Sequence, residues 1–264
     1  MVQTALNSLK MIMENQSATA HNLANVNTPG FKQDIAIDFS SIYLDTGNGI
    51  EPRIISTRNT GGFSIDQGQM ESTSNPMDIS IKNKGYFVIQ PKSGDIALSR
   101  RGDLQIGENG ELLDGAGNAM LNEGLEPIVI PPYTSITFSS EGQIYIKPIG
   151  GDQNAPPLLV ALLANSVPDD ELKLKKSLDG QIRAFTLNAE GEDEKAEIIP
   201  NQQAKILSGF LEKSNVNVVE EMVNNLDQQR KFEMHTKFIE MADELDRAGA
   251  SMMRATSGRS RIVS

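Results

Sequence analysis

Residues 217–252 read NVVEEMVNNLDQQRKFEMHTKFIEMADELDRAGASM, and the spacing of their apolar residues predicts one long helix. Intervals of three and four residues alternate, as on the seam of a coiled coil. With Val216 just before this stretch, the seam positions are Val216, Val219, Val223, Leu226, Arg230, Met234, Phe238, Met241, Leu245, Ala248 and Met252. Arg230 stands at a four-residue stutter, and Asn217 with Glu220 resembles a capping box. A helix over 217–255 would be about 60 Å long at 1.5 Å per residue.

The N-terminus repeats this pattern. Positions spaced four, three, four, three, four and three residues apart are Val2, Leu6, Leu9, Met13, Gln16, Ala20 and Leu23. The helix should end near Asn25–Asn27, because Thr28 precedes Pro29 and is therefore extended. An apolar stripe is more often the core face of a globular helix. Two stripes at the extremes of the chain, one of them unusually long, favour helices that pair as a coiled coil and serve assembly.

Charge divides the chain into three ranges. Of the net charge of −11, residues 1–33 contribute +1, residues 34–208 contribute −11 and residues 209–264 contribute −1. We therefore expect an N-terminal helix and turn over 1–33, a central domain over 34–208 and a long C-terminal helix over 209–264.

The central range is typical of β structure. Short β-rich runs are separated by turn dipeptides such as Asn109-Gly110, Glu141-Gly142, Asp179-Gly180 and Glu190-Gly191. The runs are 54–57, 77–82, 86–90, 128–130, 135–138, 143–147 and 182–187. Runs 135–138 and 143–147 predict a hairpin, and the apolar run 158–164 predicts a strand buried on both faces. The expected fold class is α+β, with a mainly antiparallel central domain.

Composition excludes several classes of protein. The 264 residues contain no Cys, so disulfides, thiolate metal sites and a Cys nucleophile are excluded. No apolar run approaches the roughly 18–20 residues that span a bilayer, so we expect no membrane insertion. The acidic balance argues against nucleic acid. The first residues lack the pattern of a cleaved signal peptide, so we expect none.

Motifs for chemistry are also missing. The sequence shows no phosphate-binding glycine loop, no G-x-G-x-x-G helix start and no nucleophile elbow. The two histidines, His21 and His235, lie outside the seams of the two helices. We therefore expect no catalytic residues, no cofactor and no metal.

Two runs beside the helices carry a family resemblance. Residues 22–32, NLANVNTPGFK, match the signature N-L-A-N-x-N-T-x-G-F-K completely. Residues 211–223 and 229–233 match L-E-x-S-N-V-N-x-V-E-E-M-V and Q-R-x-F/Y-E. Weaker matches lie at 75–81, 85–88, 99–104 and 110–113, with Met77 and Ser80 as departures. The chain thus resembles the rod and hook group of bacterial flagellar axial proteins.

The resemblance implies a structural role. In this group the terminal segments pair as a coiled coil and pack into a tube around the export channel, and the β domain faces outward. The resemblance implies that the chain is part of a rod that crosses the periplasm as a drive shaft. It also implies export of the subunits by the flagellar type III apparatus. The implied partners are proximal and distal rod subunits and further copies of the chain. Besides the seams, the interface should include residues of the two signatures, namely Asn22, Asn25, Asn27, Gly30, Phe31, Leu211, Asn215, Asn217, Glu221, Met222 and Phe232.

Alternatives remain at this point. Within the group, chain length leaves two candidate classes, the proximal and the distal rod proteins. The proximal class is favoured by the pairs Phe232-Glu233 and Asp243-Glu244 and by the segment 125–128. A secreted β-domain enzyme that acts on cell-wall polysaccharide would need a groove lined by carboxylates. An adhesin could use the tripeptide Arg101-Gly102-Asp103, although a turn is the simpler interpretation.

Overall fold

The computed structural model describes residues 2–36, 39–44, 53–58, 62–150, 156–169, 172–177, 179–188 and 192–259. Two compact units are formed by segments that interleave along the chain. The helical unit comprises Met1–Ala24, Asp34–Gly61 and Asn217–Ser264, and the β unit comprises Asn25–Gln33 and Gly62–Val216. The units follow contacts in space, whereas the three ranges expected above follow charge along the chain, so those domain boundaries stay a prediction.

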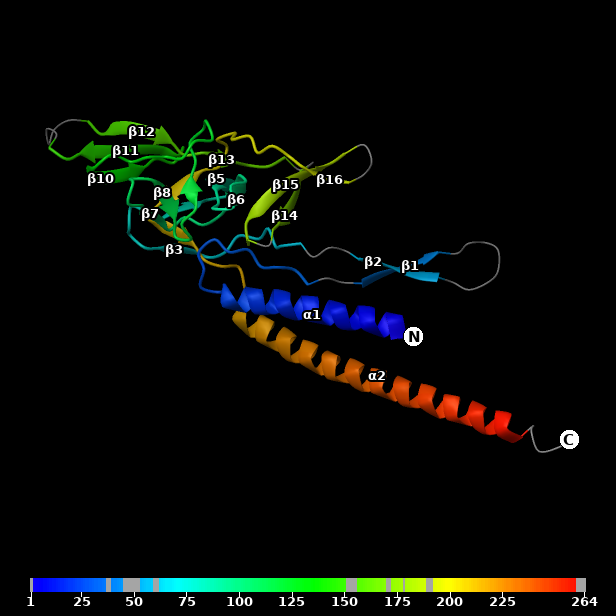
Figure 1. The fold of residues 1–264 in the computed structure, drawn as a ribbon. Helices are drawn as coiled ribbons and strands as arrows, with labels where there is room; N and C mark the ends of the chain where they lie inside the picture. The colour runs from blue at the N-terminus through cyan, green and yellow to red at the C-terminus, as the bar shows by residue number, and fades with distance from the viewer. Residues whose placement is uncertain are drawn as a thin grey trace. The chain divides into compact units, whose positions relative to one another are not determined.

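The helical unit contains two helices and a two-stranded ribbon. Helix α1 spans Val2–Ala24 and helix α2 spans Val218–Arg259, and the two lie side by side in antiparallel orientation (Figure 1). The ribbon pairs β1 (Phe39–Leu44) with β2 (Arg53–Arg58). Both predicted helices are confirmed, and the predicted strand 54–57 lies within β2. Among the described residues, no helix is long and apolar enough to cross a bilayer.

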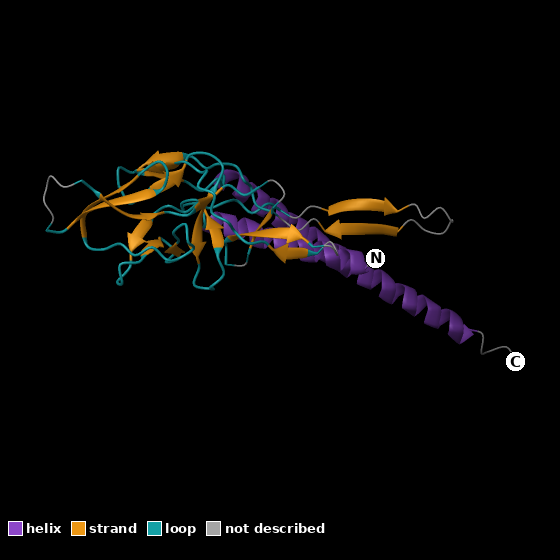
Figure 2. Ribbon diagram, turned by 90° about the horizontal axis from the view of Figure 1, so that it is seen from above, coloured by secondary structure: helices purple, strands orange, loops and turns teal. Residues whose placement is uncertain are grey.

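The β unit is built from strands and loops (Figure 2). Its largest sheet has the order β14-β15-β6-β5-β9-β8-β7, with β13 on β5 and β16 on β15. These strands are β5 (Tyr86–Gln90), β6 (Ala97–Ser99), β7 (Leu104–Ile106), β8 (Leu112–Asp114), β9 (Ala119–Met120), β13 (Asn165–Ser166), β14 (Lys173–Lys176), β15 (Ile182–Leu187) and β16 (Asp193–Lys195). Every strand pairing in the described residues is antiparallel, as expected.

Three smaller sheets complete this unit. One has the order β10-β11-β12, and the other two pair β17 with β4 and β18 with β3. Their strands are β3 (Met70–Ser72), β4 (Ile79–Ile81), β10 (Tyr133–Phe138), β11 (Gln143–Pro148), β12 (Leu158–Leu162), β17 (Ile206–Ser208) and β18 (Phe210–Glu212). The predicted hairpin is confirmed: Ile136 pairs with Ile146 and Phe138 with Ile144. Gly142 turns it with a φ of +90°.

Strand β5 lies at the centre of the core. Phe87 and Ile89 point into one buried apolar cluster, and Tyr86 and Val88 point into a second one. Because β5 has a core on each side, its sequence YFVI is apolar without alternation.

Two strand predictions are wrong. The run 158–164 was expected to be a strand buried on both faces, but β12 is the edge strand of a three-stranded sheet. Leu158 and Leu159 are exposed, and burial begins only at Leu163. The run 128–130 forms one isolated bridge, between Val129 and Glu111, instead of a strand, although Ile128 and Ile130 are buried in the core. The turn expected at Glu190-Gly191 lies outside the described residues.

Candidate assembly interface

One face of α2 carries a row of exposed apolar side chains. Leu226 is 57% exposed and Leu245 is 73% exposed, although leucine side chains are usually buried. The row, which we call the outer stripe, consists of Val219, Met222, Val223, Leu226, Met234, Phe238, Met241 and Leu245. Arg230, also exposed, interrupts it. The outer stripe contains the predicted seam positions from Val219 to Leu245 together with Met222 of the C-terminal signature, whereas Val216, the first predicted seam position, is buried.

The corresponding seam of α1 is only partly covered. Met13 is 57% exposed and Ala20 is exposed, whereas Leu9 and Leu23 are half-buried. The side chain of Leu6 lies outside the described residues.

The two helices meet through a different, more polar face. The buried residues of α1, among those described, are Ile12, Thr19 and Asn22, and the buried residue of α2 is Glu221. Asn22 Nδ2 donates to Glu221 Oε1 at 2.9 Å, and Gln228 Nε2 donates to Thr19 Oγ1 at 3.2 Å. The predicted seams are therefore not the surfaces through which α1 and α2 meet each other within one chain.

Asn22 has hydrogen-bond partners for both the nitrogen and the oxygen of its side-chain amide. It is 1% exposed, and Glu221 is 2% exposed. Besides its bond to Glu221, Nδ2 donates to the Asp34 carbonyl at 2.9 Å, and Oδ1 accepts from the Asp34 N–H at 2.7 Å. One amide thus joins the end of α1, the returning chain at Asp34 and the first turn of α2.

The remaining signature residues pack inside the β unit. Gly30 N–H donates to the Glu212 carbonyl at 2.7 Å, and a Cβ at Gly30 would lie 2.3 Å from the backbone of Arg100. Its φ of +68° also favours glycine. Asn215 Oδ1 accepts from the Gln33 N–H at 2.7 Å, and the Lys176 ammonium lies 3.7 Å from the centre of the Phe31 ring.

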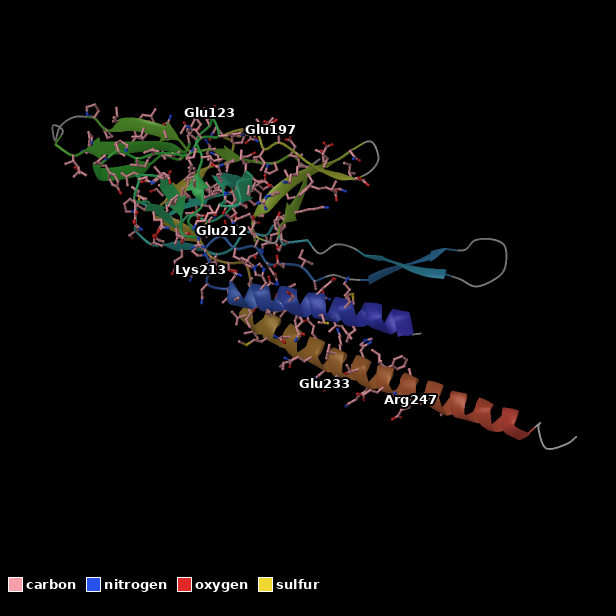
Figure 3. All side chains as sticks on the ribbon, in the orientation of Figure 1. Glu123, Glu197, Glu212, Lys213, Glu233 and Arg247 are labelled. Atoms are coloured by element: carbon pink, nitrogen blue, oxygen red, sulfur yellow. The ribbon has the colours of Figure 1, made fainter. Side chains whose placement is uncertain are left out.

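A buried ion cluster lies between these segments. The carboxylate of Glu212, labelled in Figure 3, accepts from Lys32 Nζ at 2.7 Å and from Arg100 Nη1 at 2.8 Å. The side chains of Lys32 and Glu212 are 1% exposed, and that of Arg100 is 5% exposed. Burial lowers the pKa of Lys32, and Glu212 opposes this shift. Glu212 Oε1 also accepts from the Gly68 N–H at 2.9 Å, so the cluster joins four segments of the unit.

Sequence reasoning placed some of these residues better than others. Asn217 caps α2 by accepting from the N–H of Val219 and of Glu220. Asn27 is exposed, and Asn25, Leu211 and Phe232 are half-buried, whereas Val216 is buried. Sequence reasoning missed Thr19, Lys32, Asp34, Arg100, Glu212 and Gln228. Lys32 and Glu212 could have been noticed as charged residues within the N-terminal and the C-terminal signature. Nothing in the sequence, however, indicates that they contact Arg100.

The alternatives in chemistry and adhesion find little structural support. Within the described part of the chain, no group of three or more His, Asp or Glu side chains is arranged to hold a metal ion. Arg101 and Asp103 bind each other in two-pronged fashion, at 2.7 and 2.8 Å, so the adhesion-type tripeptide has its charged groups paired. A groove of about 670 Å³ in the β unit has mainly apolar walls, including Phe63, Tyr86 and Leu172, with Asp66 and Asp169 as its carboxylates.

Comparison with known proteins supports one family. A family profile described as flagellar basal body rod FlgEFG protein C-terminal matches residues 207–252, and one described as flagellar hook protein FlgE/F/G D1 domain matches residues 80–146.

Relatives match over nearly their whole length. The flagellar basal-body rod protein FlgF of Salmonella typhimurium is 32% identical over 92% of this chain and 94% of its own. FlgF of Escherichia coli is 29% identical over the same shares, and the rod protein FlgG of Buchnera aphidicola is 31% identical over 88% and 91%. The family is structural, so the prediction that the chain is not an enzyme is confirmed. The chain therefore belongs to the flagellar basal-body rod proteins, the family that includes FlgF and FlgG.

Proposed function

We propose that this rod protein polymerises through its terminal helices. Each chain presents the outer stripe of α2 to neighbouring subunits, and the paired helices pack as a coiled coil in the wall of a tube. The supporting observation is that the outer stripe stays exposed although α1 already lies against α2. A fully buried Leu, Met or Phe side chain contributes about 1.5–3 kcal/mol, so several of them provide a strong drive for association.

The lengths of the two helices favour contacts between different chains. The 42 residues of α2 exceed the 23 of α1 by 19, so α1 of the same chain cannot cover all of α2. Contact between unlike surfaces of successive subunits produces a helical stack when the rotation from one subunit to the next does not close a ring. We propose a shaft that surrounds the export channel and links motor to hook, with the acidic β unit on its outside.

The relatives and the composition of the chain support a proposal for its place in the rod. We propose that it contacts other rod subunits and further copies of itself, and that it belongs to the proximal rod, with the distal rod as the alternative. We propose a periplasmic location in the basal body, reached through the type III exporter. Its position in purified basal bodies separates the proximal from the distal assignment.

A matched pair of variants tests the outer stripe. Leu226→Asp and Asn224→Asp each add one carboxylate to an exposed position of α2, on faces about 160° apart. We expect Leu226→Asp to abolish incorporation into basal bodies and swimming, and Asn224→Asp to retain both, with equal circular dichroism of the two monomers. Incorporation of both variants at the wild-type level would remove the outer stripe from the mechanism.

A further inference from the structure

The inner contact of the helix pair presents a physical problem. Both helices carry apolar stripes, and the hydrophobic effect favours packing of these stripes against each other within one chain. The structure instead turns the outer stripe to solvent and packs the helices through Thr19, Asn22, Glu221 and Gln228. Something in the sequence must select the polar face.

We propose that the hydrogen bond between Asn22 and Glu221 selects which face of each helix turns inward, and so keeps the outer stripe available to neighbouring subunits. This inference deepens the proposed function and rests on it. The two residues are positioning residues for assembly, since they act through the orientation of the helices and the outer stripe makes the contact with the neighbouring subunit.

The geometry of Asn22 carries the argument. Both protons of its amide are used, one by Glu221 and one by the Asp34 carbonyl, and its oxygen is used by the Asp34 N–H. Buried polar groups cost free energy when they lose their partners. Rotation of either helix to bring its apolar stripe inward separates the Asn22 amide from the Glu221 carboxylate. A buried polar residue on a helix seam is known to fix one arrangement at some cost in stability.

A second polar pair reinforces the choice. The side chains of Thr19 and Gln228 meet two turns along α2 from Glu221, and Gln228 Oε1 is buried with no hydrogen-bond partner. This layer contributes little net stability but disfavours apolar neighbours, because they would leave the same polar groups against hydrocarbon.

Engineered cysteine pairs report which face is inside. The natural chain has no Cys, so each pair is the sole source of a disulfide. Thr19→Cys with Gln228→Cys reports the polar face, because these side chains are in contact. Ala20→Cys with Leu226→Cys reports the apolar face, because both residues belong to the apolar stripes and are exposed when the polar faces meet. The full chain is oxidised in dilute solution, and only disulfides in the monomer-sized band are counted.

Three backgrounds make the test specific. Asn22→Asp places two carboxylates against each other and also removes the donor to the Asp34 carbonyl. Adding Glu221→Gln restores a donor facing an acceptor between residues 22 and 221, while the bond to the Asp34 carbonyl stays lost. Asn224→Asp makes the same chemical change at an exposed position of α2. We expect the wild type and Asn224→Asp to form mainly the 19–228 disulfide. In Asn22→Asp the ratio of 20–226 to 19–228 disulfide should rise at least about tenfold, the factor expected for loss of one buried hydrogen bond to a charged group. The double variant should return part of the way to the wild-type ratio, because it restores the bond between residues 22 and 221 but not the bond to the Asp34 carbonyl.

Several results would overturn the proposal. One is an unchanged ratio in Asn22→Asp, and another is failure of the wild type to form the 19–228 disulfide. Loss of both disulfides in Asn22→Asp would show that the pair holds the helices together without selecting a face, and would also overturn it. These results concern the isolated chain, so they are distinguishable from failure of the outer stripe in assembly, which Leu226→Asp measures in basal bodies.

Discussion

Replacing Glu212 by Gln removes the carboxylate that Lys32 and Arg100 share inside the β unit. The amide is nearly the same size, so packing is preserved and the change is mainly one of charge. Two buried cations then face each other, with the Lys32 ammonium and the Arg100 guanidinium both previously within 2.8 Å of Glu212. The carboxylate also accepts from the Gly68 N–H, and the Lys32–Glu212 bond joins the N-terminal signature to the C-terminal one, so the substitution weakens contacts of both signatures.

The expected magnitude follows from burial. Removing one partner of a buried ion pair costs about 3–5 kcal/mol, because the other charge stays buried without compensation. For a unit of this size such a loss lowers the melting temperature by about 6–20 °C. Urea unfolding followed by β-sheet circular dichroism measures it, provided that the slope with urea is unchanged.

A neighbouring residue provides a matched control. Glu71 pairs with Lys213 at 3.1 Å, but both side chains are more than half exposed. Glu71→Gln should therefore cost less than about 1 kcal/mol. Adding Lys32→Met to Glu212→Gln removes one of the two stranded cations and should recover at least about 1 kcal/mol.

The reasoning fails under two results. One is a loss in Glu212→Gln no larger than that in Glu71→Gln. The other is a double variant with Lys32→Met that is less stable than Glu212→Gln alone, since it would mean that Lys32 contributes through packing and not through its buried charge.

Three further predictions concern single residues. Burial lowers the folded-state pKa of Lys32 below 10.5, so the folded state binds this proton less tightly than the unfolded state does. The free energy of unfolding of the wild type relative to Lys32→Met should therefore rise with pH between the lowered pKa and pH 10.5. Urea unfolding at a series of pH values measures this difference, and a fall over that range would contradict the prediction. Gly30→Ala should destabilise the β unit by more than Gly180→Ala does. Both glycines have positive φ, so a side chain at either position costs about 1–2 kcal/mol, but only at Gly30 would the added Cβ also clash with the backbone of Arg100. Equal melting temperatures of the two variants would refute the predicted clash. Asn217→Ala should cost about 1 kcal/mol by removing the cap of α2, seen as faster amide exchange in the first turn of the helix; unchanged exchange at Val219 and Glu220 would show that the cap is dispensable.

Local patterns were sufficient for much of the fold. The 3–4 spacing predicts both terminal helices, since a helix period is a property of neighbouring residues. Alternation with a glycine turn predicts the hairpin of β10 and β11 for the same reason. The run at 158–164 shows the limit: apolar content does not indicate whether a strand is central or at an edge, and β12 lies at an edge with Leu158 and Leu159 exposed.

The family, the two helices and the residues that share the outer stripe could all be predicted from the amino-acid sequence, because each depends on residues that are close together in the chain. Tertiary structure alone decided which face of each helix turns inward, because heptad spacing groups residues on a face without saying what that face meets. It also decided the ion cluster, since Glu212 is separated from Lys32 by 180 residues and from Arg100 by 112. Contacts over such distances depend on how strands pair across the whole unit, and no local pattern encodes them.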